Sequence, residues 1–123
     1  GRATGKLIGK EADCIIVPVR SHDGVLVAVE CLSEHRDPAG KFLRQSFGPK
    51  SGGWLVLGND LDPHLPRYVV EGWATGAKLL EHMGGNCAVY VAFGAGRLQA
   101  VAEEVERRQP GSEVIVCTEA AHA

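Results

Sequence analysis

The sequence has no long apolar run and little net charge, and both absences exclude classes of protein. No stretch approaches the roughly 18 consecutive apolar residues of a membrane-spanning helix. Residues 1–6 also lack the apolar core of a signal peptide, so we expect a cytoplasmic protein without a membrane partner. A formal net charge of -2 gives no global attraction to nucleic acid, so such binding requires a local basic patch.

Paired cysteines are also missing. The sequence has four cysteines, far apart and mostly within apolar runs: Cys14, Cys31, Cys87 and Cys117. None shows the C-x-x-C spacing that is typical of zinc and redox sites. We therefore expect buried, reduced thiols.

The length of 123 residues suits one domain with its own core and is too short for two ordinary domains. The chain begins at Gly1 and ends on Ala-Ala-His-Ala directly after an apolar run. We expect a piece of a larger protein, with neighbouring domains on the same chain.

The first half has the pattern of antiparallel strands. Two β-branched runs, at 15–19 and 25–29, flank a Ser-His-Asp-Gly turn and predict a hairpin. Further extended segments are expected at 41–47 and 54–57, because loops rich in glycine and proline separate them. These patterns predict a β-rich N-terminal subdomain over residues 1–58.

The second half alternates strands with helices. Apolar strands are predicted at 68–70, 88–93 and 114–117, and between them apolar residues recur at helical spacing. This alternation predicts an α/β subdomain over residues 59–123, with a parallel sheet and flanking helices.

Glu71 directly follows the first of these strands and precedes a predicted helix. Ligands of parallel α/β sheets bind beyond the carboxyl ends of the strands, so Glu71, Gly94 and Thr118-Glu119 are expected along one edge. Two interpretations of Glu71 remain open at this point. It is either a catalytic acid or a solvated acid that is favourable near a helix N-terminus.

Three further groups carry candidate chemistry. Gly94, Gly96 and Arg97 follow a strand and would cradle a phosphate on backbone N–H groups, or form only a tight turn. The acids Asp60 and Asp62 form an Asp-x-Asp pair beside His64, but they lie in a loop, where we expect solvated turn residues.

The third group is basic and aromatic. Four cations interleave with Phe42 and Phe47, namely Arg36, Lys41, Arg44 and Lys50. Cations beside an exposed ring suit the backbone and bases of single-stranded nucleic acid, and we expect at least one ring beside a cation. The alternative is an ordinary strand whose phenylalanines belong to the core.

The stretch Tyr68-Val69-Val70-Glu71-Gly72-Trp73-Ala74-Thr75-Gly76 resembles the first signature of TOPRIM domains, the catalytic module of bacterial-type primases and topoisomerases. It is most similar to the short TOPRIM domains of plasmid, phage and mobile-element primases. The preceding segments 15–19, 23–24, 41–43 and 53–58 are similar to the β-rich lead-in of these primases, and 93–98 to their second strand-to-helix turn.

The resemblance implies magnesium-dependent or manganese-dependent nucleotidyl transfer on single-stranded DNA in replication, with Glu71 as the catalytic acid or base. The second TOPRIM signature is an Asp-x-Asp after a later strand. In this sequence Glu119 takes the position of the first aspartate, and the resemblance implies that it is a metal ligand. Ala121 takes the position of the second aspartate.

One interpretation of this departure is that the missing aspartates lie beyond Ala123. Otherwise the departure leaves two hypotheses of function. The chain is either an active primase domain that uses single-stranded DNA and nucleotides, or a degenerate TOPRIM module. A degenerate module would bind nucleic acid or dock onto other domains, such as a helicase or relaxase, within a replication or conjugative-transfer protein.

Overall fold

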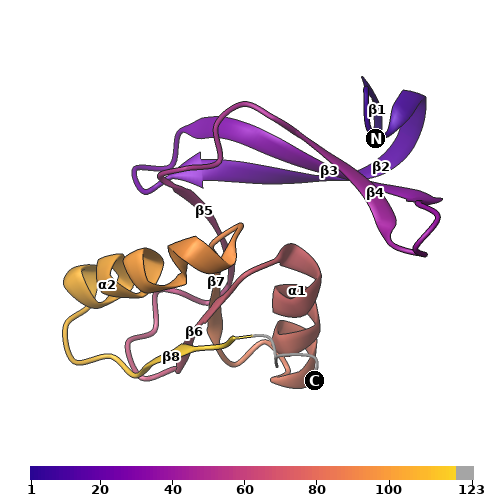
Figure 1. Cartoon of the computed structure of the whole chain (residues 1–123). Helices are drawn as coiled ribbons and strands as arrows, with labels where there is room; N and C mark the ends of the chain where they lie inside the picture. The colour runs from indigo at the N-terminus through magenta and orange to yellow at the C-terminus, as the bar shows by residue number, and fades with distance from the viewer. Residues whose placement is uncertain (119–123) are drawn as a thin grey trace. The chain divides into compact units, whose positions relative to one another are not determined.

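The computed structural model describes residues 1–118, and the chain divides into two compact units (Figure 1). The first unit is Gly1–Gly53, and the second begins at Trp54. From the sequence we expect the boundary after Gly58, at the end of a strand. The structure places the division at the start of that strand instead.

The first unit consists of strands that all pair antiparallel with their neighbours along the chain. The strands are β1 (Arg2–Gly5), β2 (Gly9–Ser21), β3 (Leu26–Arg36) and β4 (Phe42–Phe47). The predicted hairpin is confirmed by the pairing of β2 with β3. Its turn closes where the N–H of Gly24, at a φ of 89°, donates to the carbonyl of Ser21 (2.9 Å). The core of this unit is small and contains Ile8, Ala12, Cys14 and Cys31.

The second unit has a mixed sheet and two α-helices. Its elements are β5 (Gly53–Gly58), β6 (Arg67–Val70), α1 (Trp73–His82), β7 (Ala88–Val91), the 3₁₀ turn η1 (Ala95–Arg97), α2 (Leu98–Arg108) and β8 (Val114–Val116). Strand β6 pairs in parallel with β7 on one side and with β8 on the other, whereas β5 pairs antiparallel with β7. The chain is therefore a mixed α/β protein, as predicted.

The parallel arrangement is more limited than the prediction of a parallel sheet suggests. Within residues 1–118, parallel pairing involves three strands, and most strand pairs are antiparallel. The sequence predicts β5 as part of the β-rich half. In the structure β5 hydrogen-bonds to β7, because its apolar residues continue the core of the second unit.

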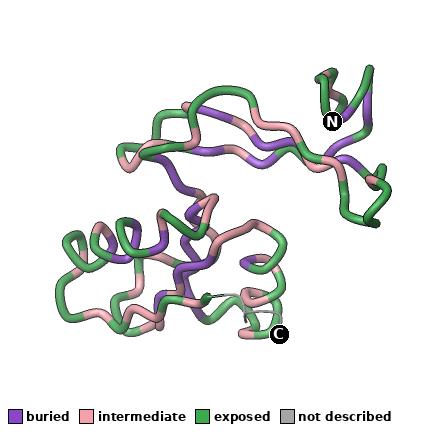
Figure 2. Tube along the Cα trace, viewed as in Figure 1, coloured by how far each residue is buried: buried purple, intermediate pink, exposed green. Residues whose placement is uncertain are grey.

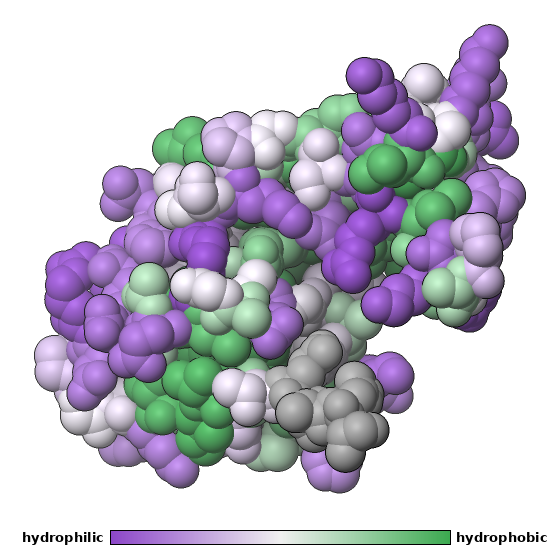
Figure 3. Space-filling model, in the orientation of Figure 1, coloured by the Kyte–Doolittle hydropathy of each residue, from purple (hydrophilic) through white to green (hydrophobic). Residues whose placement is uncertain are grey.

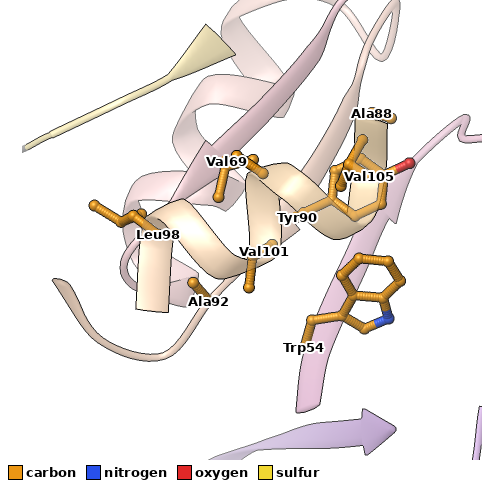
Figure 4. Packing of buried hydrophobic residues seen from close by; sticks show 9 residues of the cluster. Trp54, Val69, Ala88, Tyr90, Ala92, Leu98, Val101 and Val105 are labelled. Carbon is orange, nitrogen blue, oxygen red and sulfur yellow. The ribbon is translucent and has the colours of Figure 1, made fainter. Parts of the chain in front are cut away.

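The two helices of the second unit cover opposite faces of its sheet. Val69 and Tyr90 pack with residues of α2, as Figure 4 shows, whereas Val70 and Val89 pack with residues of α1. Successive residues of a strand point to opposite faces, so both faces of β6 and β7 are apolar. This explains the continuous apolar runs in the sequence and the buried trace through these strands in Figure 2.

The face seen in Figure 3 is largely hydrophilic, with hydrophobic residues gathered in places. Among the described residues, neither helix has the length and apolar character needed to cross a membrane.

Candidate functional site

Glu71 lies where the three parallel strands end. The N–H of Ala92 donates to the carbonyl of Val70 (2.8 Å), and the N–H of Cys117 donates to the carbonyl of Val69 (2.8 Å). The continuations of β7 and β8 therefore flank the end of β6 on both sides. The structure brings Glu71 to one edge of the sheet with the residues that follow β7 and β8, namely Ala92, Phe93, Cys117 and Thr118.

Helix α1 starts immediately after this carboxylate. Gly72 is its N-cap, with an extended backbone (φ -123°, ψ 160°) and no side-chain cap, and its carbonyl accepts from the N–H of Gly76 (3.1 Å). The first turn of the helix carries no acidic residue. The half-buried Glu71 is thus the acid next to the positive end of the α1 dipole, and both interpretations of it keep their physical basis.

The turn between β7 and α2 holds an unusual backbone. Phe93 has a φ of 60°, a left-handed conformation that costs a non-glycine residue roughly 1–3 kcal/mol. Gly94 has a φ of 152°, which favours glycine, whereas a Cβ on Gly96 would meet no atom within 4 Å. The side chain of Arg97 donates to the carbonyl of Ala92 (3.3 Å). Only Gly94 of the predicted phosphate loop is therefore required by the backbone, and phosphate binding stays a prediction.

The sequence carries no signal for the left-handed backbone of Phe93. No composition signal marks it, because phenylalanine is an ordinary residue for the end of an apolar strand.

The described part of the chain, residues 1–118, contains no group of three His, Cys, Asp or Glu side chains that could hold a metal ion. Glu119, the predicted metal ligand, lies outside the described residues, as does Ala121. Asp62 behaves as a turn residue, since its Oδ1 accepts from the N–H of His64 (2.9 Å). The prediction of a turn role for this aspartate is confirmed.

The predicted nucleic-acid-binding cations fall into two pairs on the first unit. Arg36 lies over the ring of Phe42, with its Cζ 3.9 Å from the ring centroid, and Phe42 is 53% exposed. This contact confirms the expectation of a ring beside a cation and overturns the alternative that Phe42 is a core residue. Lys41 is exposed and directly precedes β4, the strand that begins at Phe42.

The second pair surrounds a carboxylate that sequence analysis missed. Glu30 is 5% exposed, and its carboxylate lies 3.0 Å from Nζ of Lys50 and 3.8 Å from a guanidinium nitrogen of Arg44. A lone acid inside the apolar run of β3 was the available signal, because a buried carboxylate requires a cationic partner. The positive charges of Lys50 and Arg44 are therefore partly neutralised by Glu30. The charge of Arg36 lies instead over the ring of Phe42.

A comparison with known proteins finds similarity to a curated DNA primase. The chain is 32% identical over 114 residues to the DNA primase TraC of Escherichia coli. The match covers 91% of this chain and 10% of the relative's length.

The chain thus spans about a tenth of the length of the curated relative it matches. No protein-family model matches it. No solved structure matches it either.

Proposed function

We propose that the chain is a TOPRIM-type domain of a DNA primase, which takes part in magnesium-dependent nucleotidyl transfer on single-stranded DNA. The observation that carries this proposal is the position of Glu71, which follows β6 at the shared edge of three parallel strands and directly precedes α1. The similarity to a primase over most of the chain supports it.

In this proposal Glu71 is the general acid or base. Magnesium takes hard oxygen ligands in near-octahedral geometry and keeps several waters, so two carboxylates would hold it. Glu71 and Glu119 would supply them, and the metal would stabilise charge on the transferring phosphoryl group. The N–H groups at Gly94 and Gly96, with Arg97, would bind a phosphate of the nucleotide.

Primer synthesis by the full-length parent protein tests this proposal. With a single-stranded template, nucleotides and magnesium or manganese, we expect Glu71→Gln to lower the rate by about 10²-fold or more, because the amide cannot transfer the proton. Glu81→Gln is the matched control, since Glu81 is an exposed acid near the other end of α1 and should leave the rate unchanged. Full activity of Glu71→Gln would contradict the proposal.

A second candidate function is single-stranded DNA binding without a metal, by a degenerate TOPRIM module in a larger replication or transfer protein. The cation over the exposed ring of Phe42 favours it, because such a pair offers a stacking face and a charge to successive nucleotides. The residues that would contact DNA in this candidate are Arg36, Lys41, Phe42, Arg44 and Lys50.

Binding of labelled oligonucleotides in EDTA at several salt concentrations tests the second candidate. Arg36→Ala should weaken binding and reduce its salt dependence, because one fewer phosphate contact releases fewer counterions. Glu30→Gln should strengthen binding, since Lys50 and Arg44 lose their neutralising partner. Lys78→Ala, an exposed cation on α1, is the control. Absence of binding at low salt would exclude this function and leave a docking role toward other domains.

A further inference from the structure

A hollow in the second unit lies away from the Glu71 edge. It has a volume of about 200 Å³ and is lined by Trp54, Asp60, Tyr90, Val105, Arg108 and Gln109. Arg67, the first residue of β6, donates hydrogen bonds to two of these residues, Asp60 and Gln109. The hollow is thus next to the start of β6, whereas Glu71 follows its end.

Aromatic rings and a cation form one wall. The ring centroids of Trp54 and Tyr90 are 5.0 Å apart at an interplanar angle of 48°, and Figure 4 shows the two rings side by side near Val105. The guanidinium carbon of Arg108 lies 5.2 Å from the Trp54 ring centroid. Burial raises the pKa of the Tyr90 hydroxyl, which therefore stays neutral and can both donate and accept a hydrogen bond.

A buried charge is hydrogen-bonded to residues that line the hollow. Arg67 is 0% exposed, and its guanidinium donates to the carbonyls of Asp60 (2.6 Å) and Asp62 (3.3 Å) and to Oε1 of Gln109. Within residues 1–118 it forms no ion pair, and its Nε has no hydrogen-bond partner. A buried cation held only by neutral groups leaves a positive field around itself.

The polar groups around the hollow differ in how many of their hydrogen-bond donors and acceptors are already used. Both ends of the Gln109 amide are used, because Oε1 accepts from Arg67 and Nε2 donates to the Asp60 carbonyl (2.9 Å). Arg108 uses Nε in a bond to Glu104 (2.9 Å). Its two terminal nitrogens remain as donors among the described residues, and the Asp60 carboxylate remains as an acceptor.

These features specify a ligand. The volume is below the roughly 300–1,000 Å³ of pockets for drug-sized molecules, so a group of one or two rings fits. Two guanidinium groups and one carboxylate select against a cationic ligand, whereas one Asp and one Arg match an amino group beside a ring carbonyl. Guanine and cytosine present this pair on one edge, thymine and uracil lack the amino group, and adenine lacks the carbonyl.

We infer that the hollow between β5, the loop at Asp60 and the end of α2 binds a nucleobase of the amino-carbonyl type, guanine or cytosine. The base comes from a free nucleotide or from a single strand. The inference rests on the hollow alone and does not depend on whether Glu71 is catalytic.

Tryptophan fluorescence tests it directly. The sequence has two tryptophans, so the titration uses Trp73→Phe protein, in which Trp54 is the sole reporter. GMP and CMP should change the emission of Trp54, with a Kd of ~1 mM and saturation by about 10 mM. UMP and AMP should leave the emission unchanged. Short oligonucleotides of dC and of dT form the second arm. Binding of dC oligonucleotides but not of mononucleotides assigns the base to a strand.

Two matched pairs of variants, made in the same Trp73→Phe protein, locate the binding. Arg108→Ala and Asp60→Asn should each weaken it by about tenfold or more, as expected for losing a charged hydrogen bond. Arg107→Ala removes a neighbouring arginine that also pairs with Glu104, and Asp62→Asn changes a nearby loop acid outside the hollow. Both should stay within about twofold. Equal response to all four bases, no response, or binding unaffected by Arg108→Ala and Asp60→Asn would overturn the inference.

Discussion

Gly76 shows how a missing side chain sets the distance between α1 and the sheet. A Cβ at this position would lie 3.2 Å from methyl groups of Val70, Val89 and Val91, all of which are 0% exposed. Glycine therefore lets the first turn of α1 approach β6 and β7 closely. Because Glu71 and Gly72 connect β6 to this turn, the close approach also fixes where the candidate carboxylate emerges.

Gly76→Ala should lower the free energy of unfolding by about 1–2 kcal/mol. Overpacking costs roughly 1–3 kcal/mol and the gain in helix propensity is at most about 1 kcal/mol, while the three β-branched valines have little freedom to rotate. Urea denaturation followed by circular dichroism measures the change. Gly96→Ala is the control, with no atom within 4 Å of its Cβ, and should stay within about 0.5 kcal/mol. An unchanged midpoint for Gly76→Ala would contradict the packing argument.

At the scale of the element, β6 has a different chemistry at each end. The buried guanidinium of Arg67 at its start ties the carbonyls of Asp60 and Asp62 to Gln109, the residue after α2. Just past its end lies Glu71. The short strand Arg67–Val70 thus anchors the loop before it and the helix end across from it, and also positions the candidate acid.

Arg67→Met should cost about 2–4 kcal/mol of unfolding free energy. Replacing a buried charge by an apolar side chain relieves its desolvation. Here it also leaves the Asp62 carbonyl and the Gln109 amide oxygen without their donor, and the Asp60 carbonyl keeps only the bond from Gln109 Nε2. The change is read from urea denaturation. Arg20→Met removes an exposed arginine with one bond to the Gly24 carbonyl (3.1 Å) and should cost less than about 0.5 kcal/mol. A similar cost for both variants would show that the Arg67 network contributes little.

At the scale of the whole molecule, both units keep free thiols in apolar surroundings, as expected from the cysteine spacing. Cys14, Cys31 and Cys87 are buried, and Cys117 is half-buried. Burial raises the pKa of Cys31 in the first unit and of Cys87 and Cys117 in the second. The folded protein therefore holds these protons to higher pH than the unfolded chain.

The sign of the pH dependence follows from these raised pKa values. Their stabilising contribution is complete below the unfolded thiol pKa of roughly 8.5 and is lost as pH rises toward the folded pKa, by up to about 1.4 kcal/mol per pH unit for each thiol. We expect the free energy of unfolding to fall between about pH 8.5 and 10.5 when measured by urea denaturation. Cys87→Ala should fall less steeply over the same range, and an equal slope would show that Cys87 does not contribute.

Local patterns in the sequence determined most of the elements. The β2–β3 hairpin, the alternation of strand and helix after β5, and the position of Glu71 at a strand end all follow from period-2 and helical spacing over a few residues. Turn chemistry around Gly24 and Asp62 is equally local. These features need no knowledge of distant residues, because each is set by neighbours along the chain.

Only the tertiary structure decided which distant residues meet. The pairing of β5 with β7, the two cations around Glu30, and the contact of Arg67 with Gln109 join segments that no local pattern connects. The hollow lined by Trp54, Asp60 and Arg108 exists for the same reason. Its residues come from β5, the loop at Asp60, β7 and the end of α2. Burial of the shared core brings these segments together, since apolar packing acts between surfaces rather than between neighbours in sequence.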